Sequence, residues 1–336
     1  MTVKVGVIGT GNIGADHIRR LTTVTSGAEV VAVTDIDAAR AGEIAAGIGA
    51  RALATGQDVI SDDEVDAVLV ASWGPTHEEY VLAGVAAGKP VFCEKPLATT
   101  ADACLRIVDA EIAHGSRLVQ VGFMRRYDAG YRAMKKLLDS GKIGEALMVH
   151  CAHRNASTSV GHYTSDMAIV DTAVHEIDVL RWLLGEDFVA AEVRKPRKSR
   201  QAKPDLIDPQ IVLLETESGV HVDVEVYVNC RYGYDIRCEV VAETGTASLH
   251  DTSPIAVRTA EGASVPIPDD WRVRFVDAYD TEIQEWADSV AAGAVAGPSA
   301  WDGYAAAVTT DAALEAQQSG ARALVTMKDR PDFFRR

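Results

Sequence analysis

A glycine-rich turn near the start of the chain constrains the fold more than any other feature. Gly9-Thr10-Gly11-Asn12-Ile13-Gly14 follows the apolar stretch 3–8 and precedes a helical pattern over 13–24. In a Gly-x-Gly-x-x-Gly turn the glycines permit the tight turn, the close approach of backbone N–H groups to a pyrophosphate, and the packing of helix on strand. The turn therefore predicts a parallel sheet that binds a dinucleotide; the alternative is a structural turn alone.

The residues up to Gly122 alternate short apolar runs with helical patterns, which is typical of a parallel sheet covered by crossover helices. Strands are predicted at 3–8, 29–34, more weakly 51–53, then 67–71, 90–93 and 118–121. Thr76 with Glu79 predicts a capping box for a helix over 76–87, and Thr99 predicts the N-cap of the next helix. We expect an α/β Rossmann domain, doubly wound, with six mostly parallel strands.

The pattern changes after Gly122, which predicts two domains: 1–122 for the cofactor, and 123–336 for substrate binding and oligomerisation. Residues 220–228 alternate apolar with polar, which predicts an antiparallel strand partnered by 211–215, 236–242 and 247–250. A helix over 128–138, a strand over 146–154 and helices over 277–292 and 301–318 complete an α+β domain whose last helices could pack back on the first domain. Its large open sheet needs a cover, which favours a homo-oligomer, a tetramer.

Composition excludes several classes of partner. The net charge of −16 argues against a broad grip on nucleic acid or anionic lipid. The stretch 289–308 is too weakly apolar to span a membrane, and 3–8 is too short for a secretory signal. The five cysteines are odd in number and include no C-x-x-C pair, which favours a reducing cytoplasm over a disulfide framework or zinc knuckle.

Asp35 ends the second predicted strand, about 20 residues beyond Gly14, at the usual spacing for the acid that binds the adenosine ribose diol. Its carboxylate would repel a 2′-phosphate, so NAD is favoured over NADP, although Arg40 lies nearby. The alternative is that Asp35 is an ordinary N-cap for the helix after Ile36.

Lys95 lies in Cys93-Glu94-Lys95-Pro96-Leu97, which closes the fifth predicted strand where this fold delivers residues to the nicotinamide end of the cleft. Its ammonium could hydrogen-bond a reacting hydroxyl and lower the pKa of that hydroxyl. X-Pro bonds are usually trans, but a cis bond before Pro96 would fix the direction of the lysine. On spacing alone, a functional role and a merely structural role of Lys95 are equal alternatives.

Asp171, His175 and Asp178 fall at i, i+4 and i+7, on one stripe of a predicted helix. The opposite stripe, expected to face the core, holds Ala173, Ile177, Leu180 and Leu184. The alternative is a solvated polar face. A zinc site of His153, His162 and His175 lacks the usual ligand spacing, so no metal is expected.

Two motifs in order, Glu94-Lys95-Pro96 and Asp171-x-x-x-His175, resemble those of the Gfo/Idh/MocA oxidoreductase family over nearly the whole chain. Within that family, Trp73-Gly74-Pro75, the segment 120–128 and Tyr234-Asp235-Ile236 resemble the inositol dehydrogenases. The resemblance implies NAD-dependent oxidation of a secondary hydroxyl of a cyclitol, myo-inositol to its 2-keto product (scyllo-inosose), with NADH formed. Two alternatives stay open: a dehydrogenase of another sugar or polyol, and a non-catalytic NAD-binding regulator.

The same resemblance implies the site residues. Those expected to bind the cofactor are Gly9, Gly11, Asn12, Ile13, Gly14, Asp35, Ser72, Trp73, Glu94 and Lys95. Those expected to bind the polyol are Lys95, Met124, His153, Asn155, Asp171, His175, Asp178 and Tyr234. A sheet-packing aromatic is an equal alternative for Tyr234, and a hydrogen-bonded structural role is the alternative for His153 and Asn155.

Alcohol oxidation needs a hydride acceptor opposite the C–H bond and a base for the O–H proton. We assign the base to His175, since the unperturbed pKa of histidine, about 6.5, lies near working pH. Asp171 would orient His175 and stabilise the imidazolium, while Lys95 would bind the reacting oxygen.

Overall fold

The computed structural model describes residues 2–158, 163–250, 253 and 255–335. The chain forms two compact units. The N-terminal unit comprises Met1–Phe123, Tyr279–Ala307 and Lys328–Arg336, and the C-terminal unit comprises Met124–Ala278 and Val308–Met327. Among the described residues, no helix combines the length and apolar character that a membrane crossing requires.

The N-terminal unit contains a parallel six-stranded sheet in the order β3-β2-β1-β4-β5-β6, as the sequence predicts. Its strands are β1 (Val3–Ile8), β2 (Ala28–Thr34), β3 (Arg51–Ala52), β4 (Ala67–Val70), β5 (Val91–Glu94) and β6 (Val119–Gly122). The strands β2 and β3 follow one another on one side of β1, and the strands β4, β5 and β6 follow one another on its other side. The strand order therefore reverses between β1 and β4, next to Gly9, where such sheets bind their ligands.

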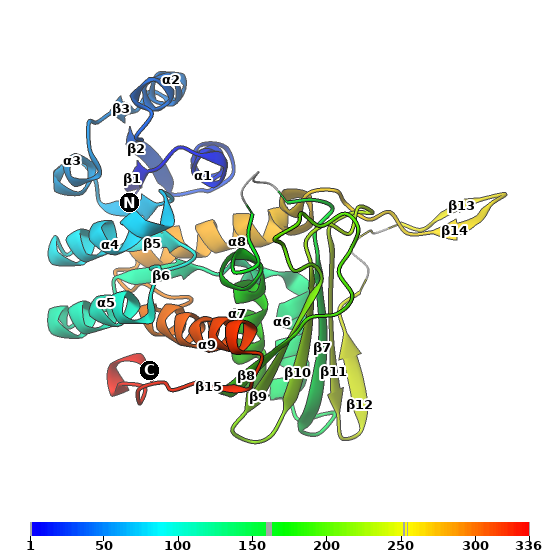
Figure 1. Ribbon diagram of the computed structural model, residues 1–336. Helices are drawn as coiled ribbons and strands as arrows, with labels where there is room; N and C mark the ends of the chain where they lie inside the picture. The colour runs from blue at the N-terminus through cyan, green and yellow to red at the C-terminus, as the bar shows by residue number, and fades with distance from the viewer. Residues whose placement is uncertain (1, 159–162, 251–252, 254, 336) are drawn as a thin grey trace. The chain divides into compact units, whose positions relative to one another are not determined.

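Helices flank this sheet: α1 (Asn12–Thr23), α2 (Ala38–Ile48), α3 (Gly56–Ser61), α4 (His77–Ala86) and α5 (Ala101–His114) (Figure 1). The side chains of Val5, Val7, Leu69 and Phe92 are wholly buried between them, because strands covered on both faces are apolar throughout. Trp286, from the later helix α8 (Trp271–Ala291), joins the same core with its ring 5.6 Å from that of Phe92.

Two predicted capping interactions are wrong, although Thr76 is the N-cap residue of α4 as expected. Thr76 precedes α4, but its Oγ1 donates to the carbonyl of Trp73 at 2.7 Å, so the capping box with Glu79 does not form. The N-cap of α5 is Thr100 rather than Thr99, and Thr100 Oγ1 accepts from the Ala103 amide at 3.2 Å. The carbonyl of Trp73 competes for the hydroxyl of Thr76, and the hydroxyl of Thr100 replaces that of Thr99. Residue spacing alone does not reveal such local competition.

The C-terminal unit contains a mixed, mainly antiparallel seven-stranded sheet in the order β12-β11-β7-β10-β9-β8-β15. The strands are β7 (Ala146–Arg154), β8 (Phe188–Arg194), β9 (Gln210–Thr216), β10 (His221–Tyr227), β11 (Asp235–Ala242), β12 (Gly245–Ser248) and β15 (Ala323–Leu324). A separate hairpin joins β13 (Val257–Thr259) to β14 (Gly262–Ser264).

The predicted partners of β10 are partly wrong. β9 does pair with β10 antiparallel, but the other neighbour of β10 is β7, which runs parallel to it. β11 pairs with β7, and β12 pairs with β11, so neither touches β10. Alternation shows that one face of a strand is apolar, but it does not identify the neighbouring strand.

Helices α6 (Ala129–Asp139) and α7 (Val174–Leu184) belong to the C-terminal unit, and α8 and α9 (Ala300–Ser319) each contribute residues to both units. α8 begins six residues before the predicted start, and its backbone departs from helical geometry at Phe275. At the end of α9, Gln317 donates to Gln210 of β9 at 2.8 Å. Short 3-10 segments at η1 (Gly74–Thr76), η2 (Met124–Tyr127) and η4 (Asp332–Phe334) and a π-helical segment at η3 (Ala168–Ala173) complete the elements.

Candidate active site

The glycine turn has the geometry that the sequence predicts. Gly9 adopts φ +99°, and a Cβ added to it would lie 2.5 Å from the carbonyl oxygen of Ala71. A Cβ on Gly14 would lie 2.1 Å from the carbonyl oxygen of Gly9. Any larger side chain at either position would push β1, β4 and α1 apart, so these glycines fix the close approach of α1 to the sheet.

Gly11 differs from the other two glycines. Apart from its own neighbours along the chain, no described residue has an atom within 4 Å of a Cβ built on Gly11, so the space beside its backbone is open. Gly11 is the N-cap of α1, and the first turn, which holds Asn12 and Ile13, carries no acidic residue. A helix N-terminus with accessible N–H groups and no competing carboxylate suits a phosphate. The open side of Gly11 therefore fits the pyrophosphate of a dinucleotide.

Asp35 lies at the end of β2 and is held by the same turn. Its Oδ2 accepts from the amide of Thr10 at 2.5 Å and from Thr10 Oγ1 at 3.0 Å, while Oδ1 accepts from the Asp37 amide at 2.9 Å. Burial alone would raise the pKa of Asp35, but these hydrogen bonds outweigh it and lower the pKa. The N-cap of α2 is Asp37, so Asp35 is not the ordinary helix cap of the alternative hypothesis.

Two residues after β4 were expected beside the cofactor. Ser72 is half-buried, and its Oγ lies 2.8 Å from Thr76 Oγ1. Trp73 is 77% exposed. His77, which was not among the predicted residues, is buried beside them. Its Nε2 lies 3.0 Å from the Ser72 carbonyl oxygen, and its Nδ1 lies 2.7 Å from the Pro96 carbonyl oxygen. His77 thus joins the loop after β4 to the loop that carries Lys95.

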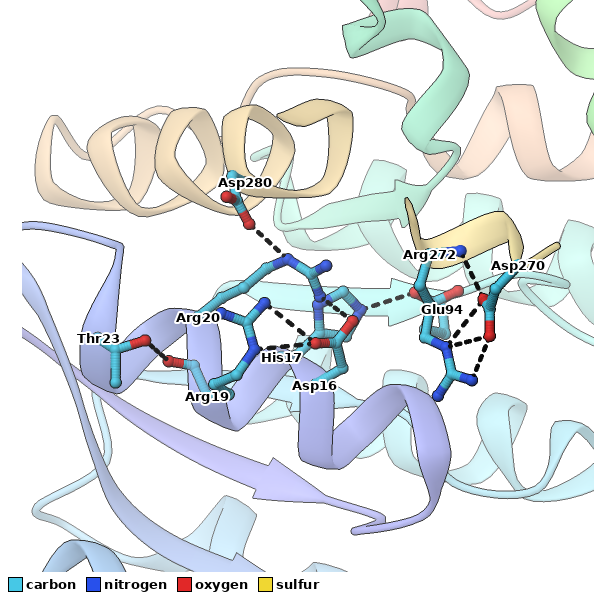
Figure 2. A network of polar contacts seen from close by, with 9 residues as sticks. All are labelled: Asp16, His17, Arg19, Arg20, Thr23, Glu94, Asp270, Arg272 and Asp280. Carbon is cyan, nitrogen blue, oxygen red and sulfur yellow. Dashed lines mark hydrogen bonds and ion pairs between the residues drawn. The ribbon is translucent and has the colours of Figure 1, made fainter. Parts of the chain in front are cut away.

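Lys95 follows β5 directly, half-buried, with a cis bond to Pro96. Its backbone amide donates to Glu94 Oε2 at 3.1 Å. The other oxygen of this buried carboxylate, Oε1, lies 2.7 Å from Nε2 of His17 on α1 (Figure 2). His17 is wholly buried and was also missed, although it follows Gly14 by one helical turn and so shares its face toward the sheet.

In the C-terminal unit, three of the predicted polyol residues come together from separate elements. His153 ends β7, His175 lies in the first turn of α7, and Tyr234 precedes β11. The ring of His153 is 6.3 Å from that of His175 and 5.6 Å from that of Tyr234, and His153 Nε2 lies 3.3 Å from the Tyr234 hydroxyl. Burial raises the pKa of Tyr234 to about 12, so its phenol remains a hydrogen-bond donor at neutral pH.

A buried ion pair supports this group, and the sequence analysis did not identify it. Arg125 of η2 and Glu176 of α7 are each 1% exposed and form a salt bridge. Nδ1 of His153 lies 3.0 Å from Glu176 Oε2 and 3.1 Å from Arg125 Nη2. Burial would raise the pKa of Glu176, but the charges of Arg125 and His153 lower it, so this carboxylate is ionised. We call Arg125, His153, His175, Glu176 and Tyr234 the His153 cluster.

Three further predicted residues lie in the C-terminal unit. Asp178 is 1% exposed and accepts from Arg126 at 2.9 Å and 2.5 Å, so it is bound by a bidentate arginine. Met124 is buried in η2. The side-chain oxygen of Asn155 is buried and has no hydrogen-bond partner among the described residues, which marks it as an acceptor available to a ligand hydroxyl.

The predicted helical stripe of Asp171, His175 and Asp178 needs correction. Asp171 is half-buried in the π-helical segment η3, whereas the other two belong to α7. The wider π turn displaces Asp171 from the position that a regular α-helix would give it, and such turns are frequent at functional sites. The first eight residues of α7, Val174–Arg181, are buried on every side, so the polar stripe is not a solvated face.

Within the described residues, no group of three or more His, Cys, Asp or Glu side chains is arranged to hold a metal ion. His162, one of the three histidines weighed for zinc, lies outside the described residues.

The family model described as "Oxidoreductase family, NAD-binding Rossmann fold" matches residues 3–123, and the model of its C-terminal alpha/beta domain matches 135–327. An inositol 2-dehydrogenase of Ralstonia nicotianae is 60% identical, with 100% of both chains covered. Inositol 2-dehydrogenase 3 of Saccharopolyspora erythraea is also 60% identical, over 99% of this chain and 98% of the relative. Myo-inositol dehydrogenase from Lactobacillus casei, solved in complex with NAD(H) and myo-inositol, is 42% identical with a TM-score of 0.96, over 99% of this chain and 100% of that chain.

Proposed function

Since the chain belongs to the Gfo/Idh/MocA family of NAD-binding oxidoreductases, we propose that it oxidises a secondary hydroxyl of a cyclitol, myo-inositol to 2-keto-myo-inositol, with NADH formed. The full-length identity of 60% to an inositol 2-dehydrogenase carries this proposal. Two observations support the proposal. The open space beside Gly11 suits a pyrophosphate, and the side-chain oxygen of Asn155, which has no hydrogen-bond partner among the described residues, suits a hydroxyl.

In the mechanism we propose, bound NAD supplies the hydride acceptor. Lys95 donates a hydrogen bond to the reacting hydroxyl oxygen and stabilises the developing alkoxide. His175 takes the hydroxyl proton as general base, and Asp171 orients its ring and stabilises the imidazolium. Residues 1–122 hold the cofactor in this proposal, and 123–336 bind the polyol and associate with other subunits.

The polyol would be held by Met124, His153, Asn155, Asp178 and Tyr234. His153 and Tyr234 contact each other at 3.3 Å, so a ring hydroxyl placed beside one would also meet the other. Arg126 binds Asp178 with two hydrogen bonds, so the orientation of this carboxylate in the polyol site would be fixed.

Strictness for NAD over NADP is a separate part of the proposal and depends on Asp35. Its carboxylate is ionised and already directed by Thr10, so a 2′-phosphate there would meet a fixed negative charge. The nearby cation Arg40 lies with its Nη2 3.4 Å from Asp37 Oδ2, and this ion pair partly neutralises the charge that could otherwise attract a 2′-phosphate.

We also propose a cytoplasmic homotetramer. The odd number of cysteines without a C-x-x-C pair favours a reducing compartment. One face of the seven-stranded sheet carries ion pairs such as Arg154 with Glu225 at 2.5 Å and lines a hollow of about 600 Å³ with His150, Asp223 and Arg237. Such a face would pair with a copy of itself across a two-fold axis. Light scattering tests this, and a monomeric mass at all concentrations would contradict it.

A substrate screen separates the proposed activity from its rivals. NADH fluorescence should appear with myo-inositol and be weaker with aldoses or deoxysugars, because a pocket that hydrogen-bonds several hydroxyls rejects analogues that lack them. A stronger signal with an aldose would favour a sugar dehydrogenase. NAD binding without turnover of any polyol or sugar would favour the regulator.

A further inference from the structure

Figure 2 shows polar side chains of α1, among them His17, which faces Glu94 at the end of β5. Nε2 of His17 lies 2.7 Å from Glu94 Oε1, and Glu94 Oε2 accepts from the backbone amide of Lys95 at 3.1 Å. His17 is wholly buried and Glu94 is 6% exposed. A carboxylate removed from water is costly unless a donor satisfies it, so His17 is the donor that keeps the Glu94 carboxylate in place.

The position of His17 is itself fixed on several sides. Its ring meets the rings of Phe92 on β5 and Tyr279 on α8 edge-on, at 5.5 Å and 5.8 Å. One turn later, Arg20 lies over the Tyr279 ring at 4.8 Å and donates to Asp280 at 2.8 Å. All these residues belong to the N-terminal unit. The imidazole therefore has little freedom to follow a displaced carboxylate.

Glu94 is equally confined from the side of β6. A Cβ built on Gly122 would lie 3.2 Å from both Cα and Oε2 of Glu94, so a side chain at this position would force Glu94 to shift. With one oxygen on His17 and the other on the Lys95 amide, the carboxylate has a single orientation. The direction in which the chain leaves β5, and with it the side chain of Lys95, depends on that orientation.

We infer that His17 is a positioning residue for Lys95: through the Glu94 carboxylate it ties the helix that begins at the phosphate-binding turn to the lysine that binds the reacting hydroxyl. The inference rests on the proposed role of Lys95 in catalysis. It explains why an ionisable side chain occupies the sheet-facing side of α1, where an apolar residue would pack as well. One rigid helix would then set both the cofactor phosphates and the catalytic amine.

Three variants test this inference. His17→Leu removes the donor at similar volume, and His17→Gln restores an N–H near the position of Nε2. Glu111→Gln is the matched control, because Glu111 is also wholly buried in the N-terminal unit and accepts from the Leu118 and Val119 amides at 2.6 Å and 2.8 Å, with no part in the proposed site. Thermal unfolding of each variant measures the loss of stability.

The first measurement does not depend on turnover. Lys95 of the NAD-bound protein is acetylated with acetic anhydride, and the rate is followed by mass spectrometry. We expect His17→Leu to change the acetylation rate of Lys95 by about threefold or more, which corresponds to about 0.7 kcal/mol in the activation free energy of acetylation. In His17→Gln and Glu111→Gln this rate should stay near that of the wild type. Unchanged labelling of Lys95 in His17→Leu would overturn the inference, even if the wild type oxidises no polyol.

The second measurement is steady-state turnover. A misplaced catalytic group costs about tenfold to a hundredfold in rate, so kcat of His17→Leu should fall by that amount while KM for NAD changes little. His17→Gln should recover most of kcat, and Glu111→Gln should keep it despite a similar loss of stability. An equal fall of kcat in His17→Leu and Glu111→Gln would show that His17 acts only through stability and would contradict the inference.

Discussion

The glycine turn and the His153 cluster are built in opposite ways. The turn is made of backbone: a Cβ on Gly9 would lie 2.5 Å from the carbonyl oxygen of Ala71, and a Cβ on Gly14 would lie 2.1 Å from that of Gly9. The His153 cluster is made of side chains from η2, β7, α7 and the start of β11, and a buried ion pair holds it together. The contacts of Gly9 and Gly14 leave no room for a side chain, whereas a side-chain site can lose its function without losing its fold.

The largest expected effect tests the side chains that we propose as catalytic. Lys95→Ala, His175→Ala and Asp171→Asn should each lower kcat by about 10²-fold to 10⁴-fold, the range for loss of a general base or its orienting group. NAD affinity, measured by fluorescence titration, should stay near wild type because none of these residues lies in the glycine turn. Wild-type turnover in His175→Ala would refute its role as base.

Breaking the ion pair of the His153 cluster should have the next largest effect. Glu176→Gln leaves the Arg125 guanidinium buried without its counter-charge, which typically costs about 3 to 5 kcal/mol. Hydrogen exchange during urea unfolding, resolved for each unit, should locate the loss in the C-terminal unit. The double variant Arg125→Met with Glu176→Leu should recover most of the stability but not the activity, and full recovery of both would show that the pair does not orient His153.

This pair also predicts a pH dependence. The fold lowers the pKa of Glu176, so its stabilisation is present above the ordinary glutamate value of about 4.3 and is lost as pH falls through the lower folded value. The stability difference between wild type and Glu176→Gln should thus be constant near neutral pH and shrink below about pH 4. A difference that grows on acidification would contradict this sign.

The glycines of the turn should separate folding from binding. Gly14→Ala should destabilise the N-terminal unit by about 2 kcal/mol or more, because its Cβ would meet the Gly9 carbonyl. Gly11→Ala should cost no more than about 1 kcal/mol, the preference of an N-cap for glycine over alanine, since φ is −66° and the space is open; yet it should weaken NAD binding about tenfold. Gly47→Ala in α2, also in open space, is the control for both. Unaltered NAD affinity in Gly11→Ala would contradict the proposed pyrophosphate site.

The smallest expected effect concerns cofactor choice. Asp35→Ser removes the carboxylate that would bind the ribose diol, so the affinity for NAD should fall about tenfold while the affinity for NADP rises. Kinetic comparison of the two cofactors measures the change. An unchanged affinity for NADP would mean that Asp35 does not select the cofactor and only accepts the hydrogen bonds of Thr10.

The same contrast explains what the sequence could predict. The turn and all six strands of the first sheet were predictable because their signals are local: glycines and β-branched runs. The pairing of β10 with β7 and the Arg125–Glu176 pair were not, because they join residues far apart in sequence. Asp171 was misplaced on its helix because a π turn has no periodic signature.

His17 falls between these cases. A histidine one turn after Gly14 on a sheet-facing helix side is a local signal, but its partner Glu94 becomes visible only when α1 and β5 are packed together. The geometry of the glycine turn was thus predictable from the sequence, whereas the contacts between α1 and the segment before Lys95 became visible only in the fold.

The most direct test of the proposed activity is transfer of the hydrogen itself. Wild-type protein is given NAD and myo-inositol deuterated at carbon 2, and the reduced cofactor is analysed by mass spectrometry and NMR. The account predicts one deuterium in the nicotinamide ring per ketone formed, and loss of both products in Lys95→Ala. Reduced cofactor without deuterium, or no reduction at all in a protein that binds NAD, would contradict it.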